Sequence, residues 1–106
     1  MEKNVNDQSF KKEVLESNLP VMVDFWAPWC LPCLMISGTV SKIASEQKEK
    51  LKVCKVNVDE APDLSQKYGI SSIPAILFFK NGRETGRVIG GLPKQELEKA
   101  IQKYAA

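Results

Sequence analysis

Histidine is absent from the 106-residue chain. Its absence excludes the Cys–His and Ser–His pairs that many nucleophilic enzymes use, and it excludes every zinc site with an imidazole ligand. Cysteine is scarce: the three cysteines are too few for a tetrahedral all-cysteine metal site. An odd, low count is also unlike the disulfide frameworks of small secreted proteins. We therefore expect no metal site and no disulfide scaffold.

Long apolar runs and clusters of one charge sign are also missing. No apolar stretch approaches the ~18–20 residues of a membrane-spanning helix, and residues 1–18 are polar and charged, unlike a targeting segment. The 15 basic and 13 acidic residues are interspersed, with basic runs no longer than pairs such as Lys11-Lys12. These features predict a cytoplasmic protein that binds neither nucleic acid nor membrane.

The apolar periodicity predicts one domain over residues 1–106, with strands and helices alternating in its first half. In the first half we expect a short strand near Val5, a helix over 8–17 capped by Asn6 or Asp7, a strand over 21–27 and a helix over 31–48. A strand over 51–58 should follow, and then a short helix opened by Ala61-Pro62-Asp63 and closed by Gly69. In the second half we expect strands over 75–79 and 84–89, joined by an Asn81-Gly82 turn, and a last helix that begins at Pro93. We therefore predict an α/β fold, with a central mixed sheet of four to five strands flanked by about four helices.

Two cysteines, Cys30 and Cys33, lie where an apolar strand is expected to end and a helix to begin. Pro32 suits the first turn of that helix, and the helix terminus favours a thiolate at Cys30. Cys33 lies one turn further in, so Cys30 should be the more exposed of the two. Cys30 could then attack a substrate disulfide and Cys33 could resolve the mixed disulfide. The alternatives are half of a zinc site or two inert thiols.

Two further residues could take part in chemistry. Asp24 is the only acidic residue in the strand over 21–27, where burial raises the pKa of a carboxyl group. Such a group can exchange a proton with Cys33, through water; the alternative is an ordinary aspartate at a strand edge or bulge. Cys54 follows Val53 within an apolar strand, so we expect a buried, inert thiol, with a regulatory or dimer-forming role as the alternative.

The segment from Val23 to Cys33, and Trp26-Ala27-Pro28-Trp29-Cys30-Leu31-Pro32-Cys33 above all, resembles the active-site sequence of the thioredoxin family. The resemblance covers about residues 5–104 and also includes Lys55-Val56-Asn57-Val58-Asp59, Tyr68-Gly69-Ile70, Ile73-Pro74, Phe79-Lys80-Asn81-Gly82 and Gly90. It implies a thioredoxin-like fold and a dithiol–disulfide oxidoreductase that reduces protein disulfides. The implied protein is a monomer, is recharged by a thioredoxin reductase, and needs no cofactor beyond the redox-active disulfide Cys30–Cys33.

The resemblance also implies roles for individual residues. Asp24 matches the family's proton-transfer aspartate, and Lys55 matches a lysine near that carboxylate, although an ordinary exposed strand lysine is the alternative. Pro74 matches a cis proline against the cysteine pair. We expect Trp26 to pack beneath the site rather than to contact the substrate. The positions of the family's apolar docking surface are occupied by Trp29, Ile73, Pro74, Ile89, Gly90 and Gly91, with a simple loop as the alternative for the glycine pair.

Three residues depart from the common family pattern. Leu31 replaces the usual glycine between the cysteines, Leu34 replaces a lysine, and Gly38 replaces a helix-kinking proline. The two leucines add apolar surface, and without the lysine a Cys30 thiolate depends more on the helix terminus. A proline immediately before the second cysteine, as at Pro32, resembles the reducing members of the family more than the oxidising ones, which have a histidine there. A disulfide oxidase or isomerase, and a non-catalytic interaction subunit, stay open as alternatives.

Overall fold

Five strands form the central sheet, in the order β1-β3-β2-β4-β5. They are β1 (Lys3–Asn4), β2 (Val21–Trp26), β3 (Lys52–Asn57), β4 (Ala75–Lys80) and β5 (Arg83–Ile89). In this computed structural model, which describes residues 2–106, β1 and β2 run parallel to β3, whereas β4 runs antiparallel to both β2 and β5. The predicted mixed sheet is confirmed.

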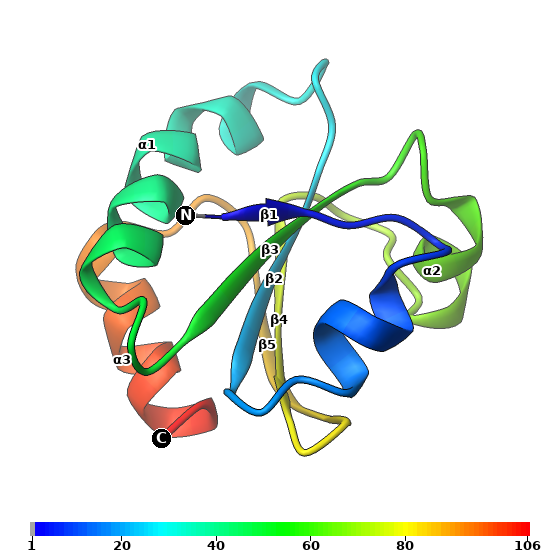
Figure 1. The fold of residues 1–106 in the computed structure, drawn as a ribbon. Helices are drawn as coiled ribbons and strands as arrows, with labels where there is room; N and C mark the ends of the chain where they lie inside the picture. Colours follow the sequence, from blue (N-terminus) through cyan, green and yellow to red (C-terminus); the bar gives the residue numbers. More distant parts are fainter. Residues whose placement is uncertain (1) are drawn as a thin grey trace.

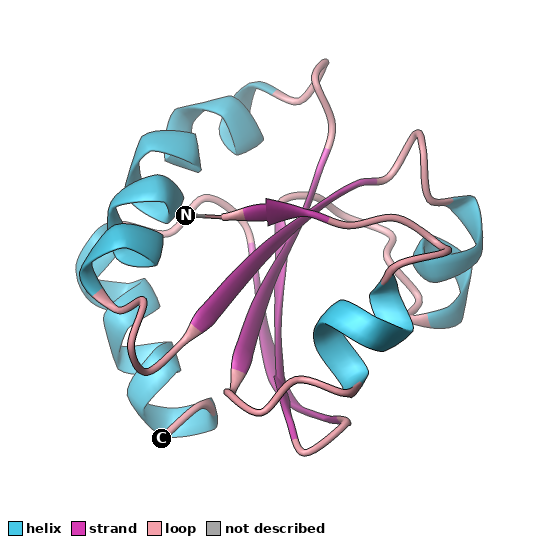
Figure 2. Cartoon of the chain, viewed as in Figure 1, coloured by secondary structure: helices cyan, strands magenta, loops and turns pink. Residues whose placement is uncertain are grey.

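Helices cover both faces of this sheet. They are η1 (Lys11–Leu15), α1 (Leu31–Glu46), α2 (Pro62–Lys67) and α3 (Lys94–Tyr104). Figure 1 shows α1 and α3 together on one face, with α2 and the unlabelled blue helix η1 on the other. The same three layers are visible in Figure 2, where the strands are separated by colour from the helices on either side.

β2 lies at the centre of the sheet and is buried on both faces. Its odd-numbered residues, such as Val23 and Phe25, pack in the cluster with Phe10 of the η1 side. Met22 packs on the opposite face, in the cluster that contains Ile36 of α1. Because side chains alternate along a strand, both parities of β2 are covered, which explains its continuous apolar sequence. Asp24 has the same parity as Met22 and so faces the α1 side, where it is the one charged residue of β2.

The N-terminal helix is shorter and wider than predicted. η1 is a π-helix, in which the Glu16 amide donates to the Lys11 carbonyl at 3.0 Å. Asn6 was predicted as a possible cap, but the N-cap of η1 is Phe10, without a side-chain cap. The Asn6 Oδ1 instead accepts hydrogen bonds from the amides of Gln8 and Ser9, in the turn before the helix. The prediction that Asp7 could cap this helix is also wrong. Its carboxylate instead accepts from the amides at the start of α2, with Leu64 N at 3.0 Å.

The turn between β4 and β5 has the predicted hairpin conformation. Asn81 has φ 54° and Gly82 has φ 79°, and a type I′ turn requires positive φ at both central residues. Lys80 pairs directly with Arg83 across the turn, and a register shift follows at Phe78 and Phe79. The hairpin brings the end of β5, and with it Ile89, beside the start of β4.

Candidate active site

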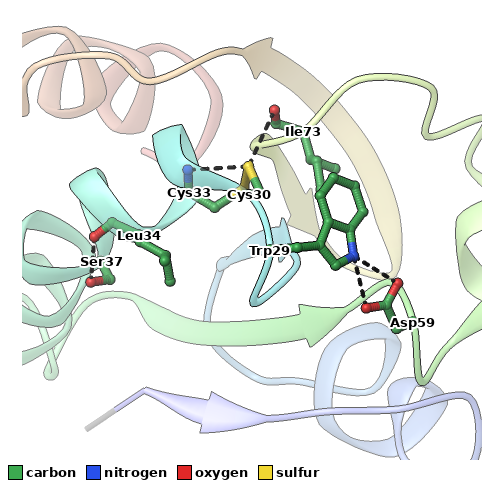
Figure 3. Close-up of a disulfide and its surroundings, with 7 residues drawn as sticks. All are labelled: Trp29, Cys30, Cys33, Leu34, Ser37, Asp59 and Ile73. Atoms are coloured by element: carbon green, nitrogen blue, oxygen red, sulfur yellow. Dashed lines mark hydrogen bonds between the residues drawn. A yellow bond between two sulfur atoms is a disulfide. The ribbon is translucent and has the colours of Figure 1, made fainter.

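A disulfide between Cys30 and Cys33 lies at the N-terminal end of α1 (Figure 3). After β2 ends at Trp26, a turn closes where the Cys30 amide donates to the Ala27 carbonyl at 3.1 Å. Cys30 then occupies the N-cap position of α1, and its Sγ accepts a hydrogen bond from the Cys33 amide at 3.2 Å. The helix terminus thus directs a backbone N–H at the Cys30 sulfur, where it would stabilise a thiolate.

Both cysteines are largely covered, with exposed fractions of 5% for Cys30 and 2% for Cys33. The order agrees with the prediction that Cys30 is the more accessible. The Cys30 Sγ lies 3.7 Å from the carbonyl oxygen of Ile73, and the Ile73–Pro74 peptide bond is cis, as the resemblance implied. The segment that leads into β4 therefore lies directly against Cys30.

The two tryptophans differ in their surroundings. Trp26 is half-buried and packs against the cluster formed by Ala27, Cys30 and Cys33, as a packing residue beneath the site should. Trp29 is 69% exposed, and its Nε1 donates to Asp59 Oδ2 at 2.9 Å. Sequence reasoning did not identify Asp59 as a partner of Trp29. No local pattern could have done so, because 30 residues separate the two.

Asp24 is buried within β2, two residues before the strand ends at Trp26, with an exposed fraction of 1%. Neither of its carboxylate oxygens has a hydrogen-bond partner within residues 2–106. Burial raises the pKa of Asp24 to about 6, against the opposing effect of the positive charge of Lys55. A buried carboxylate without a hydrogen-bond partner is costly for stability, and ionisable groups with perturbed pKa values are concentrated at functional sites.

Lys55 is the neighbour of Asp24 on the adjacent strand. The two residues pair in the parallel register of β2 and β3, and both lie on the face of the sheet that α1 covers. The Lys55 Nζ lies 4.5 Å from the centre of the Trp26 ring, a cation–π contact. A polar hollow of about 270 Å³ lies beside Trp26 and Lys55, with room for several water molecules at ~30 Å³ each.

The predicted docking residues are brought together from three segments. The Gly90 amide donates to the Pro74 carbonyl at 2.8 Å, so the loop after β5 lies against the cis proline. Gly90 has φ 102°, a backbone conformation that only glycine adopts readily. Ile89 is 48% exposed, and Gly91 lies against Pro32 of α1.

The first turns of α1 add further apolar surface. Leu31, Leu34 and Met35 have exposed fractions of 67%, 45% and 74%, and no charged residue occurs from Phe25 to Ser41. The extra apolar surface that these leucines were predicted to add is therefore present.

Cys54 lies apart from the disulfide, on β3. It is fully buried, and burial raises the pKa of its thiol to about 11. The prediction of a buried thiol is confirmed, and such a thiol is a poor nucleophile at neutral pH. Within the described chain, no group of three or more cysteine, aspartate or glutamate side chains is arranged to hold a metal ion.

A helix-capping Cys-x-x-Cys disulfide, a buried carboxylate and a cis proline on a mixed five-stranded sheet define a dithiol–disulfide oxidoreductase of thioredoxin-like fold. The thioredoxin family model matches residues 2–103, and the chain belongs to the thioredoxin family. Its redox-active pair is Cys30–Cys33, and the family to which it belongs consists of protein-disulfide reductases.

Individual relatives are similar over most of their length. The chloroplastic M-type thioredoxin of Chlamydomonas reinhardtii is 51% identical over 100 residues, which is 94% of this chain and 71% of the relative. The thioredoxin of Porphyra purpurea is 50% identical and thioredoxin 1 of Nostoc sp. is 48% identical, each over 94% of both chains. Among the described helices, none has the length and apolarity to cross a membrane.

Proposed function

We propose that Cys30 is the attacking residue and Cys33 the resolving residue in the reduction of protein disulfides. The Cys30 thiolate attacks one substrate sulfur, and the other substrate sulfur leaves as a thiolate that takes up a proton. The Cys33 thiolate then attacks Cys30 Sγ, which forms the Cys30–Cys33 disulfide and releases the second substrate thiol. Two electrons pass from the protein to the substrate. The main support is the Cys33 amide directed at Cys30 Sγ at 3.2 Å.

Asp24 is the proton acceptor in this proposal. Cys33 must lose its proton before it can attack, because the thiolate is the nucleophile. A carboxyl group with a pKa of about 6 is mostly ionised at neutral pH and still basic enough to take that proton. The proton passes through water, because neither Asp24 oxygen has a hydrogen-bond partner within residues 2–106. Lys55 adjusts the pKa of Asp24, and Trp26 packs beneath the site.

The substrate segment docks beside Cys30 on an apolar surface. This docking surface consists of Trp29, Ile73, Pro74, Ile89, Gly90 and Gly91. Ile73 precedes β4, which begins at Ala75, so its backbone is free of the sheet ladder and can pair with an extended segment of the substrate. Pro32, in the first turn of α1, has no amide to leave unpaired there and keeps the helix end close to the substrate.

The electron donor in this proposal is a thioredoxin reductase, and the protein works as a monomer of one domain over residues 1–106 in the cytoplasm. The choice of a thioredoxin reductase as electron donor is supported by membership of the thioredoxin family. Chloroplastic and cyanobacterial proteins are among the relatives, so the compartment is tested by fractionating the source cells. Light scattering of the purified protein tests the monomer.

Two assays test the reductase function. A glutathione titration, followed by the fluorescence of Trp26 and Trp29, measures the potential of the Cys30–Cys33 pair. We expect a value near the ~−270 mV of reducing thioredoxins, whereas a value near ~−120 mV would indicate an oxidase. Turnover of a disulfide-bonded protein should be lost in Cys30→Ser and kept in the control Cys54→Ala. Full biological activity in Cys30→Ser would indicate an interaction subunit instead.

A further inference from the structure

A groove of about 390 Å³ runs along α1 from Pro32, between the two cysteines, and shares only Gly91 with the docking surface described above. One wall is formed by Pro32, Met35, Ile36 and Thr39 of α1, and the other by the loop Gly91-Leu92-Pro93. This volume lies within the range of pockets that bind ligands, ~300–1,000 Å³. The groove is therefore large enough for a bulky side chain.

The groove is continuous with the reactive centre. Pro32 separates the two active-site cysteines along with Leu31, and Gly91 follows Gly90, whose amide is bonded to the carbonyl of Pro74. Gly91 also lies against Pro32 and Ile36. A polypeptide that is joined to Cys30 and continues past Gly91 would pass directly over this groove.

The walls of the groove carry no charge. All seven lining residues are uncharged, and Met35 is 74% exposed. The nearest charged residue along the chain, Lys94, directs its Nζ to Glu46 at 2.8 Å and to Glu98 at 3.9 Å. A charged side chain in the groove would lose water without gaining a partner, whereas an apolar side chain would gain from burial.

The dimensions give the position of that side chain in the substrate. In a disulfide the two Cα atoms lie ~4.4–6.8 Å apart, which holds the substrate cysteine beside Cys30. Along α1, Met35 is ~7.5 Å and Thr39 ~13 Å beyond Cys30, at ~1.5 Å per residue. An extended segment advances ~3.3 Å per residue, so it spans the same distance in two to four residues.

We propose that the groove between Met35 and Leu92 binds an apolar side chain of the substrate, two to four residues from the substrate's reactive cysteine. This inference rests on the proposed function, because it places the substrate segment by its bond to Cys30. It makes Met35 a residue that determines which protein disulfides are reduced.

The test uses peptide disulfides with the reduced full-length protein. Each peptide contains one cysteine, is oxidised to its disulfide-linked dimer, and carries Leu, Lys or Glu at the tested positions, before the cysteine in one series and after it in another. The second-order rate constant for oxidation of the protein is followed by tryptophan fluorescence. The variants are Met35→Glu, Thr39→Glu at the far end of the groove, and the control Ser45→Glu, an exposed α1 residue ~15 Å beyond Met35.

In one series the native protein should react about ten-fold faster with the Leu peptide than with the Lys or Glu peptide. In Met35→Glu the Lys peptide should react fastest, followed by the Leu peptide and then the Glu peptide. Thr39→Glu should reduce the preference for the Leu peptide, while Ser45→Glu should keep the native order of rate constants. Two results would overturn the proposed role of the groove: rate constants within two-fold of one another for all three peptides in both series, or an equal change in peptide preference in Ser45→Glu. No reaction with any peptide or with a small disulfide such as cystamine would instead contradict the proposed function itself.

Discussion

The indole Nε1 of Trp29 donates a hydrogen bond to Oδ2 of Asp59 at 2.9 Å, across 30 residues of sequence. The Asp59 backbone is itself held, since its amide donates to Asn57 Oδ1 at 3.0 Å. Trp29 is 69% exposed, so packing alone does not orient it. The hydrogen bond holds this large apolar side chain, which is adjacent in sequence to Cys30, in the docking surface proposed above.

Removing this hydrogen bond should weaken substrate docking without changing the cysteine chemistry. We expect Asp59→Ala to slow the reduction of a protein disulfide by about two- to ten-fold, the effect of losing ~0.5–1.5 kcal/mol, and to shift the Trp29 indole N–H signal in NMR spectra. Asp59→Asn keeps an acceptor oxygen and should lie closer to the native rate. The neighbouring exposed acid gives the control, Glu60→Ala; an equal loss there would refute the role of Asp59.

Asp24 should make the protein less stable as the pH rises. Its pKa in the folded protein is about 6, above the ordinary value of 3.8, so the folded state holds a proton that the unfolded state releases between about pH 4 and 6. Stability therefore falls across this interval and is constant above it. The shift corresponds to about 3 kcal/mol at most, which Asp24→Asn should remove.

Urea unfolding at a series of pH values measures this effect. Relative to the native protein, Asp24→Asn should gain stability progressively from about pH 4 to pH 6 and keep that gain at higher pH, whereas the exposed control Glu49→Gln should follow the native curve. Parallel curves for the native protein and Asp24→Asn across that interval would contradict the raised pKa.

Lys55 should lower the pKa of Asp24 through its positive charge. The two residues pair across β2 and β3, and removing the charge leaves the carboxylate with less compensation for its burial. We expect Lys55→Met to raise the pKa of Asp24 above its native value, as measured by ¹³C NMR titration of the carboxyl carbon. Lys67→Met is a matched control, because Lys67 also lies over an aromatic ring, that of Tyr68. An unchanged or lower value in Lys55→Met would be inconsistent with this account.

The two adjacent glycines of the docking surface should respond differently to substitution. Gly90 has φ 102°, so Gly90→Ala should destabilise the protein by about 1–2 kcal/mol and disturb the hydrogen bond to Pro74. A Cβ on Gly91 would meet Ile36 Cγ2 at 3.5 Å, an ordinary contact, and Gly91→Ala should stay within ~0.5 kcal/mol of the native protein. Thermal unfolding compares the two; equal losses would argue against a special backbone position at Gly90.

Local sequence patterns were sufficient to predict much of this fold. The strand over 21–27 was expected to be buried on both faces because apolar residues occupy both parities, and Met22 and Val23 do pack in opposite clusters. The Asn81-Gly82 turn follows from the positive φ that these residues tolerate. The burial of Asp24 follows from its place in the same strand.

Contacts between distant segments could not be predicted in this way. Asp7 caps α2 from 57 residues away, and Asp59 meets Trp29 only because the ends of β2 and β3 lie side by side. The cis bond before Pro74 came from the family resemblance alone, since only about 5–6% of such bonds are cis. The groove at Met35 likewise requires α1 and the loop after β5 to be placed together.

The division of roles between the two cysteines is tested most directly by trapping the mixed disulfide. Reduced Cys33→Ser and Cys30→Ser are each mixed with a disulfide-bonded protein, and the adducts are located by mass spectrometry after proteolysis. The account predicts a stable adduct on Cys30 in Cys33→Ser, and none in Cys30→Ser. An adduct on Cys33 in Cys30→Ser that forms as fast as the first, or an adduct on Cys54 in either variant, would contradict it.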